Sequence, residues 1–206
     1  MEEKNTDLRV IRTKQSIRDA FVDLIEEKGF EAITVKDITT KANINRGTFY
    51  AHYQDKFDLM SKCEDEIMHE MTRIAKQNFP GLIAAIESNT PTLEPNPIAI
   101  SMLEYINKNH GFMKAMLGPK GIVTFQSRIK ELLWNTIFKD SPNSIFKEEK
   151  LLVPGYYLAS YIASAHIGVI QKWLESGREE SPQEMARILS TITVNGPLFA
   201  AGLKSK

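Results

Sequence analysis

Apolar residues recur at helical spacing along most of the chain, and this periodicity restricts the possible folds more than any other feature. The first stripe follows the spacing i, i+3, i+4, i+7 and i+8, which places its members on one face of an α-helix. Its members are Ile17, Ala20, Phe21, Leu24 and Ile25. Further stripes lie within residues 60–74, 98–107 and 122–137, and no stretch of useful length alternates like a strand. The sequence therefore predicts an all-α protein of about eight or nine helices.

Short polar signals divide the first part of the chain into separate helices. Gly29 is expected to end the first helix, because glycine adopts the left-handed conformation of a helix end without strain. Thr34 and Asp37 form a capping-box pattern that begins the second helix. Asn43 tolerates the conformation that ends this helix, and Asn45 is a suitable cap for a short third helix. The first region is therefore expected to hold three helices.

The rest of the chain carries similar signals. Asp55 is expected to cap a long fourth helix that runs to about Gln77. Residues 88–97 hold three prolines without periodicity and predict a loop, and residues 141–144 predict a second break. The eighth helix is expected over about residues 149–176.

The last helix has a strong start signal and an awkward end. Ser181 is the expected N-cap, with Pro182 at the first helical position and Glu184 completing a capping box. Pro197 is expected to kink this helix or end it near Asn195, because proline lacks the backbone N–H of a helix interior.

Composition excludes several classes of protein. The chain has 206 residues, 42% of them hydrophobic and 25% charged, which predicts a soluble protein of one or two domains. Its single cysteine, Cys63, excludes an intrachain disulfide and a cysteine-based metal cluster. The charged N-terminus lacks a secretory signal, so we expect a cytoplasmic protein. The 21 uncharged residues at 151–171 include Pro154 and several polar groups, and predict a buried or interface helix instead of a membrane span.

No arrangement of residues predicts an enzyme. Glu66, His69 and Glu70 are the nearest approach to a metal site, but their spacing is loose and the region is rich in solvated charge. The chain holds no glycine-rich phosphate loop and no nucleophile elbow. We therefore expect no catalytic residue, no metal and no cofactor.

The second and third predicted helices, joined by a turn of about three residues, have the spacing of a helix-turn-helix at about residues 34–53. In that motif the second helix of the pair enters the major groove. Gly47 would let its backbone approach DNA closely, and Thr48 and Tyr50 offer polar groups. Lys56, at the start of the fourth helix, could place its charge and nearby N–H groups against a phosphate. Phe49 and Tyr53 would anchor the third helix inward.

The segment "TVKDITTKANINRGTFYAHYQDKFDLM" resembles the TetR/AcrR-type regulators, whose pattern reads roughly T-V-x-x-I-A-x-x-A-x-V-S-x-G-T-F-Y-x-H-F-x-x-K-E-x-L. With the first helix, the resemblance covers about residues 11–60. The departures are mild: Thr39 replaces alanine, Asn45 a serine or threonine cap, Tyr53 phenylalanine and Phe57 glutamate.

The resemblance implies roles for the matching positions in DNA binding. Residues implied to contact or approach phosphates are Thr34, Lys36, Tyr50, His52 and Lys56. Residues implied to face the bases are Arg46, Gly47 and Thr48. The alternatives are that Lys36 and Arg46 form a solvated face and that Tyr50 is a core aromatic. The basic residues before the apolar stripe of the first helix, Arg9, Arg12 and Lys14, could add contacts to the minor groove or to phosphates. The alternative is that they are simply solvated.

The resemblance also implies an architecture and partners. Residues 1–60 would form the helix-turn-helix domain, and residues 61–206 a larger helical bundle that binds a ligand and dimerises. Candidate pocket residues are Met71, Met102, Ile106, Met113, Met116, Phe125, Trp134, Tyr157 and His166. Candidate dimer-interface residues are Tyr161, Ala165, Gly168, Ile188, Ile192, Gly196 and Phe199. The alternative for each pocket candidate is that it simply packs in the core. The alternative for His166 is that it is a core or interface histidine whose hydrogen bonds are satisfied within the protein.

The functional expectation is a cytoplasmic repressor that binds a roughly palindromic double-stranded DNA operator as a homodimer. A small apolar or amphipathic effector of unknown identity would release it. The alternative function is a coactivator or adaptor that uses the same fold to bind protein. The basic and hydroxyl-bearing residues of the third helix favour DNA.

Overall fold

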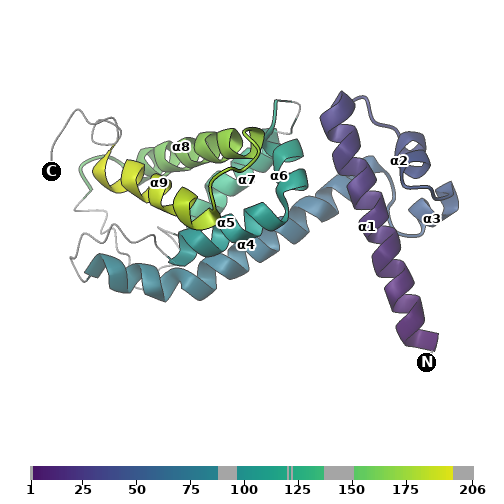
Figure 1. Cartoon of the computed structure of the whole chain (residues 1–206), viewed down its shortest axis with the longest axis horizontal. Coiled ribbons are helices and arrows are strands. Elements are labelled where there is room, and N and C mark those ends of the chain that lie inside the picture. Colours follow the sequence, from purple (N-terminus) through teal and green to yellow (C-terminus); the bar gives the residue numbers. More distant parts are fainter. Residues whose placement is uncertain (1, 88–96, 120, 122, 137–150, 197–206) are drawn as a thin grey trace. The chain divides into compact units, whose positions relative to one another are not determined.

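The computed structural model describes residues 2–87, 97–119, 121, 123–136 and 151–196, and within these ranges it is all-α, as predicted (Figure 1). The described residues form nine helices and no strand. The helices are α1 (Glu2–Lys28), α2 (Val35–Lys41), α3 (Arg46–Tyr50), α4 (Lys56–Glu87), α5 (Pro97–Lys108), α6 (His110–Leu117), α7 (Val123–Trp134), α8 (Gly155–Glu175) and α9 (Pro182–Asn195).

The chain folds as two compact units. The N-terminal unit comprises Met1–Ile67 and Gly111–Val123, and the C-terminal unit comprises Met68–His110 and Thr124–Lys206. Most of α6 therefore belongs with α1, α2 and α3, although it lies far from them in the sequence. The predicted functional domains, 1–60 and 61–206, stay a prediction, because the units describe packing and not activity.

The N-terminal unit is built on the apolar stripe of α1. Ile17, Phe21 and Ile25 are fully buried, as are Ile38 of α2 and Phe49 of α3. From α6, Phe112, Met113 and Met116 are also buried in this unit. Figure 1 shows α2 and α3 together on one side of α1. Each short helix is thus held by a buried anchor, which is necessary because helices of this length are not stable on their own.

Local signals set most of the predicted boundaries in this unit. Gly29 ends α1 with φ 77°, and Asn43 follows α2 with φ 53°. The capping box of Thr34 and Asp37 is present, and Asn45 caps α3 through its side chain. Phe30 packs edge-on against Phe21, with ring centroids 6.1 Å apart. These predictions are confirmed.

Three predicted boundaries change. The third helix ends at Tyr50 instead of Tyr53, where the backbone N–H of His52 bonds the Phe49 carbonyl only three residues before it. The fourth helix runs to Glu87 instead of Gln77. The eighth begins at Gly155, directly after Pro154.

The C-terminal unit packs α5 and α8 against α9. The capping box of Ser181 and Glu184 begins α9, and the helix ends at Asn195, as predicted. A side-chain hydrogen bond also joins two elements of this unit: Arg178 donates to Asn107 at 2.7 Å.

No helix in the described residues is long and apolar enough to cross a membrane. The predicted break at 141–144 and most of the predicted loop at 88–97 lie outside the described residues.

Candidate nucleic-acid interface

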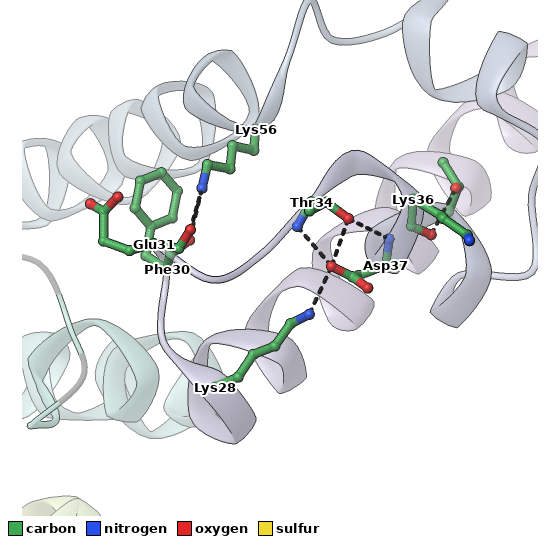
Figure 2. A network of polar contacts seen from close by, with 8 residues as sticks. Lys28, Phe30, Glu31, Thr34, Lys36, Asp37 and Lys56 are labelled. Atoms are coloured by element: carbon green, nitrogen blue, oxygen red, sulfur yellow. Dashed lines mark hydrogen bonds and ion pairs between the residues drawn. The ribbon is translucent and has the colours of Figure 1, made fainter.

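The start of α2 is fixed by a compact polar network (Figure 2). The Asp37 carboxylate accepts hydrogen bonds from the backbone N–H of Thr34 at 2.8 Å and from the Thr34 hydroxyl at 2.7 Å. It also pairs with the Lys28 ammonium, 2.7 Å away, at the end of α1. The hydrogen bonds from Lys28 and Thr34 hold the pKa of Asp37 well below its usual range. The first turn of α2 is therefore tied directly to the last turn of α1.

The other end of α2 is tied to α1 by a second ion pair. The Lys41 ammonium bonds the Glu27 carboxylate and lies 3.4 Å from the Asp23 carboxylate. The hydrogen bond to Glu27 is the main cause of the raised pKa of Lys41. The positive charge of Lys41 is therefore matched within the unit.

The cap of α3 involves both the backbone and the side chain of Thr48. Asn45 Oδ1 accepts from the backbone N–H of Thr48 at 2.7 Å and from its hydroxyl at 3.0 Å. Thr48 is half-buried, and because its hydroxyl donates to Asn45, the hydroxyl oxygen can still accept a hydrogen bond from a partner.

Gly47 lies on the exposed surface at the second position of α3. A Cβ placed there would lie 3.3 Å from Oδ1 of Asn45 and would crowd the cap. Apart from its two chain neighbours and the backbone of its own helix, no other atom of the described residues lies within 4 Å of that Cβ. The outer side of the glycine is therefore open, as a close approach of backbone to DNA requires.

The aromatic residues of this segment divide into inner and outer groups. Phe49 is fully buried and Tyr53 nearly so, which confirms that both anchor the helix pair. Burial raises the pKa of Tyr53 to about 12. Tyr50 is 55% exposed and stands edge-on to Phe49, with ring centroids 5.6 Å apart. Tyr50 is thus held on its inner edge and offers its outer edge to solvent.

Lys62 supports this segment, and the sequence did not predict its role. Lys62 of α4 donates to the backbone carbonyl of His52 at 3.2 Å and pairs with Asp58 at 2.9 Å. Its ammonium also lies 5.3 Å from the centre of the Tyr53 ring. The i, i+4 spacing of Asp58 and Lys62 was the available signal, but only the tertiary structure shows that Lys62 reaches the end of the helix pair.

Lys56 lies at the start of α4, as predicted, but its side chain folds inward (Figure 2). Its ammonium donates to the backbone carbonyls of Phe30 at 3.1 Å and Glu31 at 2.9 Å. The sequence predicted that this charge would face a phosphate, but in the structure it faces two backbone carbonyls of the protein itself.

The remaining predicted contact residues form an outer face on α2 and α3. Its exposed members are Thr34, Lys36, Arg46, Gly47 and Tyr50. Within the described residues neither Lys36 nor Arg46 makes an ion pair, and Figure 2 shows the amine of Lys36 pointing away from the network around Asp37. His52 is half-buried beside Tyr53. This face combines unpaired cations, an open glycine and an aromatic hydroxyl over a core that includes Ile38 and Phe49.

Comparison with known proteins agrees with this geometry. The family model "Bacterial regulatory proteins, tetR family" matches residues 17–63, and the model "Transcriptional regulator C-terminal region" of the same family matches residues 94–195. The two matches cover the helix pair and most of the C-terminal unit. The chain belongs to the TetR family of transcriptional regulators.

Two curated proteins are similar in sequence to this TetR-family regulator. It is 28% identical to YxbF of Bacillus subtilis strain 168, described as an HTH-type transcriptional regulator, over 90% of this chain and 46% of that protein. It is also 28% identical to the transposon Tn10 TetC protein of Escherichia coli, over 68% of this chain and 64% of TetC. The chain thus spans about half to two thirds of the length of these relatives.

A solved structure shows the same fold. A TetR transcriptional regulator from Streptococcus agalactiae 2603V matches with a TM-score of 0.57 at 20% identity. The match covers 93% of this chain and 98% of that one. At this identity the likeness concerns the fold.

The predicted pocket residues of the regulator fall into two groups. Met113 and Met116 belong to the N-terminal unit through α6. The others belong to the C-terminal unit, where Met71, Ile106 and Phe125 are buried, while Met102, Trp134 and His166 are half-buried. Tyr157 is 63% exposed and is not enclosed within its own unit.

The residue His166 has a specific partner. Its Nε2 lies 2.8 Å from the hydroxyl of Thr193 on α9, and that hydroxyl donates to the carbonyl of Leu189 at 2.7 Å. The Thr193 oxygen therefore accepts from Nε2–H of the histidine. Burial lowers the pKa of His166 and favours the neutral ring. These contacts agree with the alternative of a satisfied histidine.

The described candidates for the dimer interface lie on α8, on α9 and at the C-cap of α9. Tyr161, Gly168 and Ile188 are exposed, and Ala165, Ile192 and Gly196 are half-buried. Phe199 lies outside the described residues.

The metal-binding alternative gains no support from the described residues, in which no group of three or more histidine, cysteine or carboxylate side chains is placed to hold an ion. Glu66 instead pairs with Arg18 at 3.1 Å.

Proposed function

We propose that this TetR-family regulator is a repressor that binds a roughly palindromic operator as a homodimer. A small apolar or amphipathic molecule would bind the C-terminal unit and release the protein from DNA. The proposal assigns DNA contact to the outer face of α2 and α3 and dimerisation to α8 and α9.

The observation that carries the proposal is the outer face itself. Lys36 and Arg46 project from a helix pair whose inner side is fixed by two ion pairs to α1 and by buried Phe49. An unpaired cation on a rigid support can neutralise a phosphate without first losing an internal partner. Arg46 also begins α3, and in a helix-turn-helix the early residues of the second helix meet the base edges.

A second surface supports the homodimer. Tyr157, Tyr161, Ala165 and Gly168 share one face of α8, and both tyrosines are more than half exposed. On Gly168 an added Cβ would meet no described atom within 4 Å apart from its chain neighbours and the backbone of α8, so a second helix could approach closely there. Exposed large apolar side chains on one face are typical of an interaction surface. A two-fold interface would use the same face twice and require a two-fold operator.

The proposed effector site uses the apolar side chains of the C-terminal unit. Met71, Ile106 and Phe125 are buried there, with Met102 and Trp134 half-buried. Methionine side chains adapt to ligands of different shape, and this set offers no formal charge to bind a strongly ionic molecule. We therefore infer an apolar or amphipathic effector.

DNA binding is tested by fluorescence anisotropy with a labelled duplex from the region upstream of the protein's own gene. Binding is expected at low salt, with the logarithm of the association constant falling linearly as the logarithm of salt rises. Lys36→Met should reduce that slope by about 1.8 in a dimer, since each lost phosphate contact accounts for about 0.9. Absence of binding at low salt to any part of this region would contradict the proposal.

The dimer is tested by sedimentation and by DNA binding. Tyr161→Glu should give a monomer and weaken operator binding, because the glutamate would be buried without a partner in the interface. Leu152→Glu is the control, since Leu152 is 100% exposed and lies outside α8. A Tyr161→Glu protein that remains dimeric would show that the interface lies elsewhere.

The effector is tested by thermal shift with a panel of apolar, amphipathic and ionic molecules. A ligand present at 100 times its dissociation constant should stabilise the folded protein by about 2.7 kcal/mol. The same ligand should release the labelled duplex, and Phe125→Ala should weaken both effects. Stabilisation by ionic molecules only would refute the proposed effector class.

A further inference from the structure

We propose that Lys56 is a positioning residue of the DNA-binding unit, which together with Phe57 clamps the turn between α1 and α2 and does not bind a phosphate. The inference rests on the proposed DNA-binding function, because the turn that is clamped leads directly into the helix pair. It reverses the role that the resemblance implied for this lysine.

The ammonium group of Lys56 has two well-placed acceptors. It donates to the carbonyl oxygens of two consecutive residues, Phe30 at 3.1 Å and Glu31 at 2.9 Å. Both distances suit a charge-assisted hydrogen bond, which is about twice as strong as a neutral one. The side chain spans from the first residue of α4 to the connection that follows α1.

Two aromatic rings complete the surroundings of this charge. The ammonium lies 4.8 Å from the centre of the Phe30 ring and 5.3 Å from that of Phe57. The two rings pack edge-on, with centroids 5.3 Å apart. Cations within about 6 Å of a ring face are attracted to it. The clamp thus consists of two carbonyls and two rings around one charge.

Phe57 is the feature that makes the clamp particular to this chain. It is 58% exposed, an unfavourable setting for a phenylalanine that packs only for burial. It stands where the pattern of the resembling family has glutamate. A glutamate would offer no ring face to the ammonium, so the phenylalanine favours the inward orientation of Lys56.

The clamped turn determines where α2 begins. The Phe30 carbonyl that accepts from Lys56 also accepts from the backbone N–H of Ile33 at 3.2 Å, which closes the turn. The next residue is Thr34, the N-cap of α2. Lys28 and Lys41 hold the helix pair to α1, and Lys56 holds its entry to α4. A phosphate would have to displace both carbonyls before it could bind this charge.

The test compares Lys56→Met, Lys56→Arg and Lys36→Met with the unchanged protein. Anisotropy with the duplex is measured over a series of salt concentrations at a temperature where circular dichroism shows every variant folded. Lys56→Met is expected to bind about five- to tenfold more weakly at every salt concentration, with an unchanged slope. Lys56→Arg should bind the duplex about as tightly as the unchanged protein, because a guanidinium group also donates to carbonyls and stacks on aromatic rings. Lys36→Met should reduce the slope.

Hydrogen exchange on the free protein provides the second measurement. The amides of Ile33 and Thr34 should exchange faster in Lys56→Met than in the unchanged protein, since both belong to the clamped segment. Lys36→Met should leave them unchanged.

Three results would overturn the inference. If Lys56→Met reduced the salt dependence of the association constant as much as Lys36→Met does, Lys56 would be a phosphate contact. An unchanged affinity with only a lower melting temperature would make it merely structural. Unchanged exchange at Ile33 and Thr34 would show that no clamp exists. If the unchanged protein bound no duplex, the proposed function would fail, and exchange would still decide whether the clamp forms.

Discussion

Gly47→Ala separates the stability of the helix pair from its approach to DNA. Alanine is favoured over glycine in a helix by at most about 1 kcal/mol. Against this, the new Cβ would lie 3.3 Å from Oδ1 of Asn45, and loss of that cap costs about 0.5–2 kcal/mol. The two effects oppose each other, so the free energy of unfolding should change by less than about 1 kcal/mol. The melting temperature should then move by no more than about 4 °C.

The effect of Gly47→Ala on DNA affinity should be much larger. The glycine is exposed at the second position of α3, where the added methyl group would lie between the helix backbone and the DNA. Overpacking of a close contact costs about 1–3 kcal/mol, and about 1.4 kcal/mol corresponds to a tenfold change in affinity. We expect about five- to 150-fold weaker binding in the anisotropy assay, with a melting temperature close to that of the unchanged protein.

The control places Gly47→Ala in an Asn45→Gly background. Glycine is an acceptable N-cap, within a few tenths of a kcal/mol of asparagine, and it removes the oxygen that the new Cβ would crowd. An affinity loss that persists in this background arises at the DNA surface. A loss that disappears there arises from the displaced cap. Unchanged affinity in Gly47→Ala itself would refute close backbone approach at this position.

Three further predictions concern the N-terminal unit. Phe49→Ala should lower the free energy of unfolding by about 3–5 kcal/mol in urea denaturation, because the ring is fully buried. Asp37→Asn should lose less stability than the unchanged protein between pH 7 and pH 3, because the folded carboxyl has a lowered pKa. Its stabilisation is present above the ordinary value of 3.8 and is lost as pH falls through the lowered pKa; equal losses would contradict this. Cys63, whose thiol pKa is raised to about 12 mainly by burial, should react with a thiol reagent at pH 8 only as the protein unfolds.

The candidate site was predictable where its signals are local. Thr34, Asp37 and Asn45 act within about three residues of themselves, so their capping roles follow from the sequence and are present in the structure. The burial of Phe49 and Tyr53 follows equally from their helical spacing. The roles of the outer residues in DNA binding stay predictions, because they depend on a partner.

The targets of the lysines were not predictable, because a long flexible side chain can meet groups far away in the sequence. Lys56 reaches the carbonyls of Phe30 and Glu31, and Lys41 reaches Glu27. The sequence treats these lysines alike as basic residues near a helix-turn-helix. Only the packing of α1, α2 and α4 distinguishes a charge that is matched inside the unit from one, such as Lys36, that remains on its surface.

The sequence by itself determined the all-α class, the capped ends of α2, α3 and α9, and the family. These features depend on short-range periodicity and hydrogen bonding, which are written into neighbouring residues. Tertiary structure alone decided that most of α6 joins the N-terminal unit and that Lys56 points inward. Each of these depends on which distant surface an element meets, and the free energy of that contact outweighs the local preference of the segment.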